Sequence, residues 1–371
     1  MKLLTAVTAS TFLVLVGCGS QSSPLTSVVP PPLGTIIFEL GNPGPIFAIA
    51  ADGTHRRGIH AGSESCCPRM SPDGSQMVVT DLGTGKPTAA MLRLDGSAYT
   101  VLQFPDPTLQ VADPWAFSPD GVTIAGEGGE GADGPGPREG IYTFKLPLGA
   151  GLTRVDSSPG RREFPIAFSP DGSKILFVRQ LQLGEHYEGP MNLFVVNSDG
   201  TGLVQLNPAG TTTSLIDTPI VSTASWSPDG REVAFMAANG SFSDGSFSTS
   251  ESAVFVVSSG GANPRRITPW GKTDSAVWSP SGGWIAFVSS TGGTDLFVVH
   301  PDGTGLKAIT SAADGSFSFG PVWSPNSGTL VFLRSKTDFD STDLWTVNVD
   351  GSKLAQLTHL PGTYNSYSWI P

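Results

Sequence analysis

Short apolar runs, separated by clusters of Gly, Pro, Asp and Ser, recur along most of the chain. Runs at 175–178, 233–236 and 285–288 each follow such a cluster, and a second set, including 193–196 and 296–299, comes later in each unit. Runs this short, rich in β-branched and aromatic residues and bounded by turn formers, are typical of β-strands. The pattern therefore predicts an all-β chain of short strands joined by tight turns.

One turn sequence marks the repeat. An aromatic residue or Met is followed by Ser-Pro six times, and in four of these cases Asp-Gly comes next. Proline sets φ at the first central position of a type I turn, Asp suits the next position, and Gly accepts the left-handed conformation that ends a three-residue hairpin loop. The spacing of 45 to 58 residues leaves room for four strands in each unit, which predicts the blades of a β-propeller. The anchor prolines are Pro72, Pro119, Pro170, Pro228, Pro280 and Pro325.

The two ends of the chain complete one another as a further blade. Residues 367–371 match the first strand of a unit, with Ile370 where other units have Ser, and residues 34–38 and 46–49 resemble the second and third strands. Pairing the C-terminal strand beside residues 36–38 would hide sheet edges that otherwise stay exposed. We therefore predict a seven-bladed β-propeller of four-stranded blades over 34–371, closed by the C-terminal strand in the N-terminal blade.

These repeats resemble the PD40, or WD40-like, repeat of the TolB family, the periplasmic propeller of the Tol–Pal system. The resemblance covers about residues 34–371. It implies a binding or scaffolding role in the cell envelope, although a shared fold says little about the partner. TolB itself has six blades and an additional N-terminal domain, whereas seven blades are predicted here.

The first 33 residues resemble an export signal and a tether. Lys2 precedes an apolar run at 3–16, and residues 15–18, Leu-Val-Gly-Cys, resemble the bacterial lipobox. We predict a lipoprotein signal peptide at 1–17, a lipid on Cys18 and a Pro-rich tether at 18–33. The alternative is an ordinary secretory signal with a coincidental cysteine. The mature chain is then expected to be exported and held by its lipid alone, at the outer membrane facing the periplasm or at the cell surface in a Gram-negative organism.

Composition and charge narrow the function classes. The chain has 46 Gly and 31 Pro, yet 39% of its residues are hydrophobic, so the Gly and Pro are better explained by many turns than by disorder. A formal net charge of −11 disfavours nucleic acid and anionic lipid surfaces as partners. We expect a monomer whose partner is an envelope protein or a small ligand.

Motifs for catalysis are missing from the sequence. It has no Gly-x-Ser-x-Gly nucleophile elbow, and its five histidines show no zinc-ligand spacing. We predict no catalytic residue, no metal site and no cofactor, with calcium as the open alternative. Carboxylates that invite the calcium interpretation, without EF-hand spacing, are Glu127, Glu130, Asp133, Glu139, Asp338, Asp340 and Asp343.

Cys66 and Cys67 are adjacent, which is unusual. With Cys18 lipidated, they are the remaining thiols of a protein in an oxidising compartment. Three outcomes are open: a strained vicinal disulfide, two reduced thiols, or a bond between molecules.

The mouth of the central channel is the strongest candidate for a binding site. First strands of propeller blades line the channel, so residues aligned four positions before the Ser-Pro aromatic should ring one opening. Acidic, amide and aromatic side chains there suit a cationic or hydroxylated ligand, or a peptide end. The alternative is a polar, water-filled funnel. The ring consists of Cys66, Asp113, Phe164, Ser222, Asp274, Phe319 and Asn365, with Glu163 beside Phe164.

Three functions are consistent with these features. The first is a non-catalytic envelope lipoprotein that serves as a protein- or ligand-binding scaffold. The second is a propeller lyase or hydrolase that acts on exported carbohydrate or peptide, with the acidic mouth residues as general acid and base. The third is a structural component of the envelope.

Overall fold

The structure is a computed structural model, and it describes most of residues 34–371. The segments outside the description are 1–33, 61–64, 84, 86, 105, 107, 130–136, 147–149, 157–160, 182–189, 214–223, 244–245, 337–340 and 361. The predicted signal peptide, Cys18 and the tether thus lie outside the described residues. Within the described part, no helix is long and apolar enough to cross a membrane.

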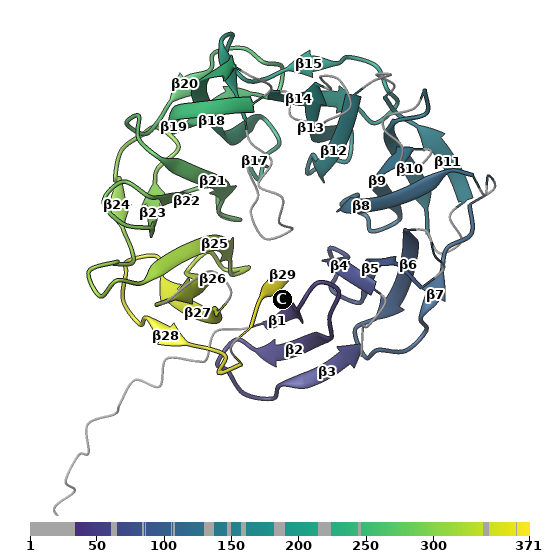
Figure 1. Ribbon diagram of the computed structural model, residues 1–371, viewed down its shortest axis with the longest axis horizontal. Helices are drawn as coiled ribbons and strands as arrows, with labels where there is room; N and C mark the ends of the chain where they lie inside the picture. Colours follow the sequence, from purple (N-terminus) through teal and green to yellow (C-terminus); the bar gives the residue numbers. More distant parts are fainter. Residues whose placement is uncertain are drawn as a thin grey trace, which may run out of the picture. The chain divides into compact units, whose positions relative to one another are not determined.

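Seven antiparallel sheets surround a common centre (Figure 1), which confirms the predicted seven-bladed propeller. We number the blades from the N-terminus. Blade 1 contains β29 (Tyr364–Ile370), β1 (Thr35–Leu40), β2 (Ile46–Ala50) and β3 (Arg57–His60). Blade 2 contains β4 (Ser65–Met70), β5 (Gln76–Asp81), β6 (Thr88–Arg93) and β7 (Thr100–Val101), and blade 3 contains β8 (Gln110–Phe117), β9 (Thr123–Gly129), β10 (Gly140–Lys145) and β11 (Ala150–Arg154).

The remaining blades follow in the same order around the ring. Blade 4 contains β12 (Arg161–Phe168), β13 (Lys174–Leu181), β14 (Met191–Asn197) and β15 (Val204–Gln205). Blade 5 contains β16 (Thr211–Thr212), β17 (Ala224–Trp226), β18 (Glu232–Ser243), β19 (Ser246–Ser258) and β20 (Arg265–Arg266). Blade 6 contains β21 (Thr273–Trp278), β22 (Ile285–Ser289), β23 (Asp295–Val299) and β24 (Lys307–Ala308), and blade 7 contains β25 (Phe317–Trp323), β26 (Thr329–Ser335), β27 (Asp343–Asn348) and β28 (Ala355–Gln356).

Blade 1 joins the two ends of the propeller. β29 pairs antiparallel with β1, with Trp369 opposite Ile36 and Tyr367 opposite Phe38. Figure 1 shows the purple β1 beside the yellow β29. The predicted closure is confirmed, and the ring is held by a ladder of backbone hydrogen bonds between its first and last strands.

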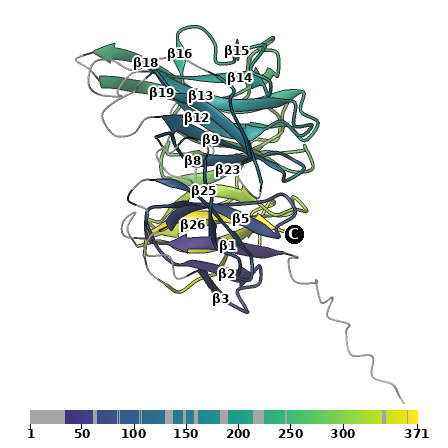
Figure 2. The same ribbon diagram turned by 90° about the vertical axis from the view of Figure 1, so that its right-hand side faces the viewer.

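Blade 5 departs from the predicted four strands. Its inner edge is divided between β16 and β17, and both pair with β18. The β18–β19 hairpin, with strands of 12 and 13 residues, projects beyond the other blades in Figure 2. The outer part of the hairpin is a Ser-rich run in which Phe242 pairs with Phe247.

Apolar side chains fill the seams between consecutive blades. Because side chains alternate along a strand, Phe177 of β13 packs toward blade 3 while Val178 packs toward blade 5. The aromatic residue before each Ser-Pro lies in the seam with the preceding blade. Trp323, for example, donates its Nε1 hydrogen to the carbonyl of Val277 at 2.9 Å.

The Ser-Pro-Asp-Gly turn has the predicted geometry. In blade 3 the Ser118 hydroxyl donates to Asp120 at 2.5 Å and accepts from the amide of Thr123 at 2.9 Å. Gly121 has φ of 69°, the left-handed conformation that the sequence predicted for this position.

Replacing Trp369 by Ala should lower the free energy of unfolding by about 3–5 kcal/mol, the usual range for truncating a buried aromatic residue. Its indole is 8% exposed and packs in the seam between blades 7 and 1. Urea unfolding followed by circular dichroism measures the change. The control Leu203→Ala, at an exposed position, should change stability by less than about 0.5 kcal/mol. An equally small loss for Trp369→Ala would contradict the packing of β29 in the core.

Candidate functional site

Strand register places four of the predicted mouth residues at equivalent positions of their blades. Cys66, Phe164, Asp274 and Phe319 lie near the starts of the innermost strands, opposite the equivalent position of the second strand in each blade. Those innermost strands surround the centre of the ring in Figure 1. The four residues therefore lie at one level of the propeller, as their alignment in the sequence predicted.

Asp113 and Asn365 do not occupy that paired position. In β8 the register pairs Ala112 with Glu127 and then skips to Ala116, so Asp113 lies inside a bulge. In blade 1 the register passes from Ser366 to Tyr364 and skips Asn365. The four-residue count holds where one extra residue separates the mouth position from the aromatic residue or Met, as in β4, β12, β21 and β25. The bulge of β8 contains one residue more, whereas β29 pairs regularly with β1 from Ser366 to Trp369. The side chains of Asp113 and Asn365, and all of Ser222, lie outside the described residues.

A β-bulge follows the mouth position in several blades, and no residue pattern in the sequence predicted it. Cys67, Ser275 and Gly320 are equivalent residues in β4, β21 and β25, and their φ angles are 64°, 62° and 66°. The left-handed region favours glycine, so the bulge holds Cys67 and Ser275 in an uncommon conformation. Because Cys, Ser and Gly share no side-chain chemistry, the left-handed conformation at this position is visible only in the backbone angles.

Glu163 is a buried structural group and not an open mouth ligand. Its side chain is 0% exposed and accepts a hydrogen bond from Arg179 Nε at 2.6 Å. Arg179 also pairs with Asp156 and lies 4.6 Å from the ring centre of Phe194. Burial raises the pKa of Glu163 to about 7, against the opposing effect of the Arg179 charge. Arg179 was not predicted from the sequence, and the available signal was a cation directly after the apolar run 175–178.

Asp274 is the mouth carboxylate that retains some exposure. It accepts a hydrogen bond from the amide of Ser275 at 2.7 Å, and burial raises its pKa to about 6. Asp274 lies opposite Val288, whose side chain packs in the seam between blades 6 and 7. Opposed residues share a sheet face, and Phe319 packs against the same seam cluster. Asp274 and Phe319 therefore flank one seam at the mouth.

Cys66 and Cys67 are both buried, and the structure draws no bond between their sulfur atoms. Cys66 lies opposite Thr80, which accepts a hydrogen bond from Trp115 of blade 3. The amide of Cys67 donates to Glu39 of blade 1 at 3.1 Å. Cys67 thus connects blade 2 to blade 1, while Thr80, the strand partner of Cys66, connects blade 2 to blade 3. A vicinal disulfide stays a prediction for chemical measurement.

Of the described carboxylates considered for calcium, Glu127 and Asp343 accept hydrogen bonds from neighbouring side chains, and Glu139 is buried. Glu127 forms two hydrogen bonds of 2.7 Å with Arg162. Asp343 accepts from Thr358 at 2.8 Å, just as Asp295 accepts from Thr310 one blade earlier. Over the described ranges, no group of three or more His, Cys, Asp or Glu side chains could hold a metal ion. Glu130, Asp133, Asp338 and Asp340 lie outside those ranges.

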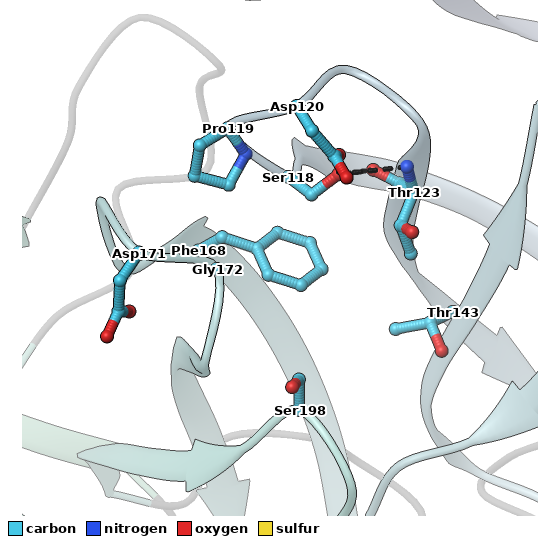
Figure 3. Close-up of a pocket in the computed structure, with 9 residues that line it drawn as sticks. All are labelled: Ser118, Pro119, Asp120, Thr123, Thr143, Phe168, Asp171, Gly172 and Ser198. Atoms are coloured by element: carbon cyan, nitrogen blue, oxygen red, sulfur yellow. Dashed lines mark hydrogen bonds between the residues drawn. The ribbon is translucent and has the colours of Figure 1, made fainter.

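A pocket of about 400 Å³ lies between blades 3 and 4, at the end of the innermost strands away from the mouth. Phe168 is at its centre in Figure 3, between the two Ser-Pro-Asp-Gly turns. Phe168 and Phe164 are four residues apart along β12, which corresponds to roughly 13 Å in a strand. This pocket was not predicted from the sequence. Its lining consists of Ser118, Pro119, Asp120, Thr123, Thr143, Phe168, Asp171, Gly172 and Ser198.

Replacing Asp274 by Asn should stabilise the protein at pH 7.5 by about 1–3 kcal/mol. The folded state raises the pKa of Asp274 from 3.8 to about 6. The contribution of Asp274 to the free energy of unfolding of the unaltered chain therefore falls as the pH rises through this interval. The stability advantage of Asp274→Asn should vanish near pH 4. Urea unfolding between pH 4 and pH 7.5 measures it.

The control Asp302→Asn removes a carboxylate whose pKa is lowered by hydrogen bonds from Thr304, so it should give no gain at pH 7.5. Equal stability of Asp274→Asn and the unaltered chain at every pH would contradict the burial of this carboxylate.

Comparison with known proteins identifies the family. Residues 139–371 match the family model described as the TolB beta propeller domain, PD40. An uncharacterised protein of Agrobacterium fabrum, Atu1656, is 30% identical over 157 residues, which cover 39% of this chain and 50% of that protein. The chain thus spans about half the length of this relative.

Solved structures share the fold at low sequence identity. TolB from Acinetobacter baumannii has a TM-score of 0.53 and 16% identity, covering 94% of this chain and 69% of that one. An oligogalacturonate lyase in complex with manganese has a TM-score of 0.61 and 13% identity, covering 82% of each chain. These likenesses concern the fold alone, whereas the family model matches more than half of the chain. The protein belongs to the PD40 family of TolB β-propellers.

Proposed function

We propose that this protein is a non-catalytic, exported envelope lipoprotein whose propeller binds a partner protein at the channel mouth. The observation that carries the proposal is the difference in burial between the two described acidic residues of the mouth. Glu163 is fully buried and paired with Arg179, whereas Asp274 is partly exposed beside the seam that holds Phe319. A carboxylate next to an aromatic ring is suited to binding a polar or cationic group of a partner.

Acid–base catalysis is less well supported by the same residues. Sugar-cleaving enzymes with acidic sites commonly use two carboxyl groups with separate roles on either side of the reacting bond. Of the two mouth carboxylates whose side chains are described, Glu163 is engaged by Arg179 at 2.6 Å. It therefore holds an interior arginine instead of facing a substrate.

Membership of the TolB family supports a place in the cell envelope, since the family resemblance implies a periplasmic propeller. The lipobox-like sequence ending at Cys18 supports export and a lipid anchor. We include both in the proposal, with the propeller at 34–371 as the binding domain on a Pro-rich tether.

A second candidate function is an enzyme that acts on exported carbohydrate. Asp274 favours this candidate, because burial raises its pKa to about 6, close to the pH at which a general acid or base would act. The oligogalacturonate lyase is an enzyme with the same fold. Such an enzyme would depend on Asp274 or Asp113 as an acid or base.

Site-directed photo-cross-linking in living cells tests the proposal. A photoreactive phenylalanine analogue in place of Phe319 should give one discrete cross-linked product in the envelope, and Asp274→Asn should reduce its yield at least threefold. The matched control places the same analogue at Leu354, an exposed site on blade 7 away from the mouth, and should give no such product.

The enzyme candidate is tested in parallel on the purified chain. Oligogalacturonate should remain uncleaved with and without manganese. Turnover that Asp274→Asn or Asp113→Asn abolishes would overturn the proposal in favour of the enzyme.

A further inference from the structure

The pocket between blades 3 and 4 exists because one side chain departs from the repeat. In blades 5, 6 and 7 the residue before Ser-Pro is Trp226, Trp278 or Trp323, and each indole lies in the seam with the preceding blade. Blade 4 has Phe168 at this position. A phenyl ring is smaller than an indole and has no N–H group, so part of the seam is left unfilled, as Figure 3 shows.

Blade 3 also lacks tryptophan before its Ser-Pro, but its seam is filled in another way. Phe117 stands there, and the same cluster contains the buried Trp115 together with Phe104 and Phe144. The seam behind Phe168 contains smaller apolar residues, among them Ala116 and Ala125. The two seams that have phenylalanine before Ser-Pro are therefore filled differently.

A second departure makes the same pocket more polar. Thr143 of β10 lines it, while the equivalent third-strand positions of the next three blades hold Val195, Val256 and Val298. Thr143 is buried, and it lies opposite Ala125, whose side chain faces this seam. Blade 7 also has a threonine, Thr346, at the equivalent position. The Thr143 hydroxyl thus replaces the valine of blades 4, 5 and 6, and it offers a hydrogen bond inside the pocket.

The rim of the pocket carries negative charge. Asp120 and Asp171 belong to the two turns that border it, and both carboxylates are exposed. Hydrogen bonds from Ser169 and Ser173 lower the pKa of Asp171 to about 2, and Ser118 and the Val122 amide lower that of Asp120. Both rim groups are therefore ionised at neutral pH, and the positive charge of Lys145 also lowers the pKa of Asp120.

We propose that this pocket binds an indole side chain of an extended partner segment in which lysine flanks the tryptophan. The seam already accommodates an indole at the equivalent place in three other blades, and cavities bind groups that complete their packing. Thr143 is placed to accept a hydrogen bond from the indole N–H, and the rim carboxylates favour a neighbouring ammonium group. This site is separate from the channel mouth and does not depend on the mouth being a binding site.

Titration of the full chain with short peptides tests the proposal. Acetyl-Lys-Trp-Lys-amide should bind saturably with one equivalent, and acetyl-Lys-Ala-Lys-amide at least tenfold more weakly, since the indole supplies the buried area. Acetyl-Glu-Trp-Glu-amide should bind at least threefold more weakly at low salt, with a smaller difference at high salt. Nuclear magnetic resonance should show the largest shift changes at the amides of 118–123 and 169–174.

Two substitutions separate this pocket from the mouth. Phe168→Trp places in blade 4 the residue that blades 5, 6 and 7 already hold, so it should keep or raise the melting temperature and weaken peptide binding at least tenfold. The control Phe319→Trp alters the mouth and should leave binding unchanged.

Unchanged affinity in a folded Phe168→Trp variant, equal binding of the alanine peptide, or shift changes confined to other blades would each overturn the proposal. If Phe168→Trp fails to fold, the chemical-shift changes of the unaltered chain on adding peptide still decide whether the peptide binds at this pocket.

Discussion

The backbone pairing of β29 with β1 is the constraint on which the rest of the propeller depends. Each blade buries both faces against its neighbours, so every seam needs a blade on either side. Blades 7 and 1 can meet only when the last strand of the chain completes the first sheet, with Tyr367 opposite Phe38 and Trp369 opposite Ile36. Without this ladder, the inner edge of β1 would be left as an unpaired strand edge, and the seam cluster between blades 7 and 1 would lose Trp369 and Tyr367.

Closure also determines where chemistry can occur. In a closed ring, the innermost strands present their starts at one opening of the channel and their Ser-Pro turns at the other. β12 illustrates both: Phe164 and Glu163 lie toward the mouth, while Phe168 at the other end lines the pocket. One strand therefore contributes to two separate surfaces. Differences between blades, more than the shared repeat, decide what each surface can bind.

The fold could be predicted from the sequence because its signals are local and repeated. The Ser-Pro turns fix the blade spacing, and the fragments at the two ends match the missing strands of one blade. The mouth was predicted less completely, because register depends on bulges that leave no residue signature at Cys67 or Ser275 and displace Asp113 from its aligned position. Burial was a further obstacle. Glu163 has the residue type of a ligand, but its contact with Arg179 comes from the neighbouring strand and is visible only in three dimensions.

Hydrogen exchange of β1 tests ring closure most directly. In the full chain, the amides of Ile36, Ile37 and Phe38 should be protected as strongly as those in the central strands of other blades, since β1 lies between β29 and β2. In a chain that ends at residue 363, protection of β1 should fall by at least tenfold and more than that of β13 in the distant blade 4. Equal protection of β1 with and without residues 364–371 would contradict closure by the C-terminal strand.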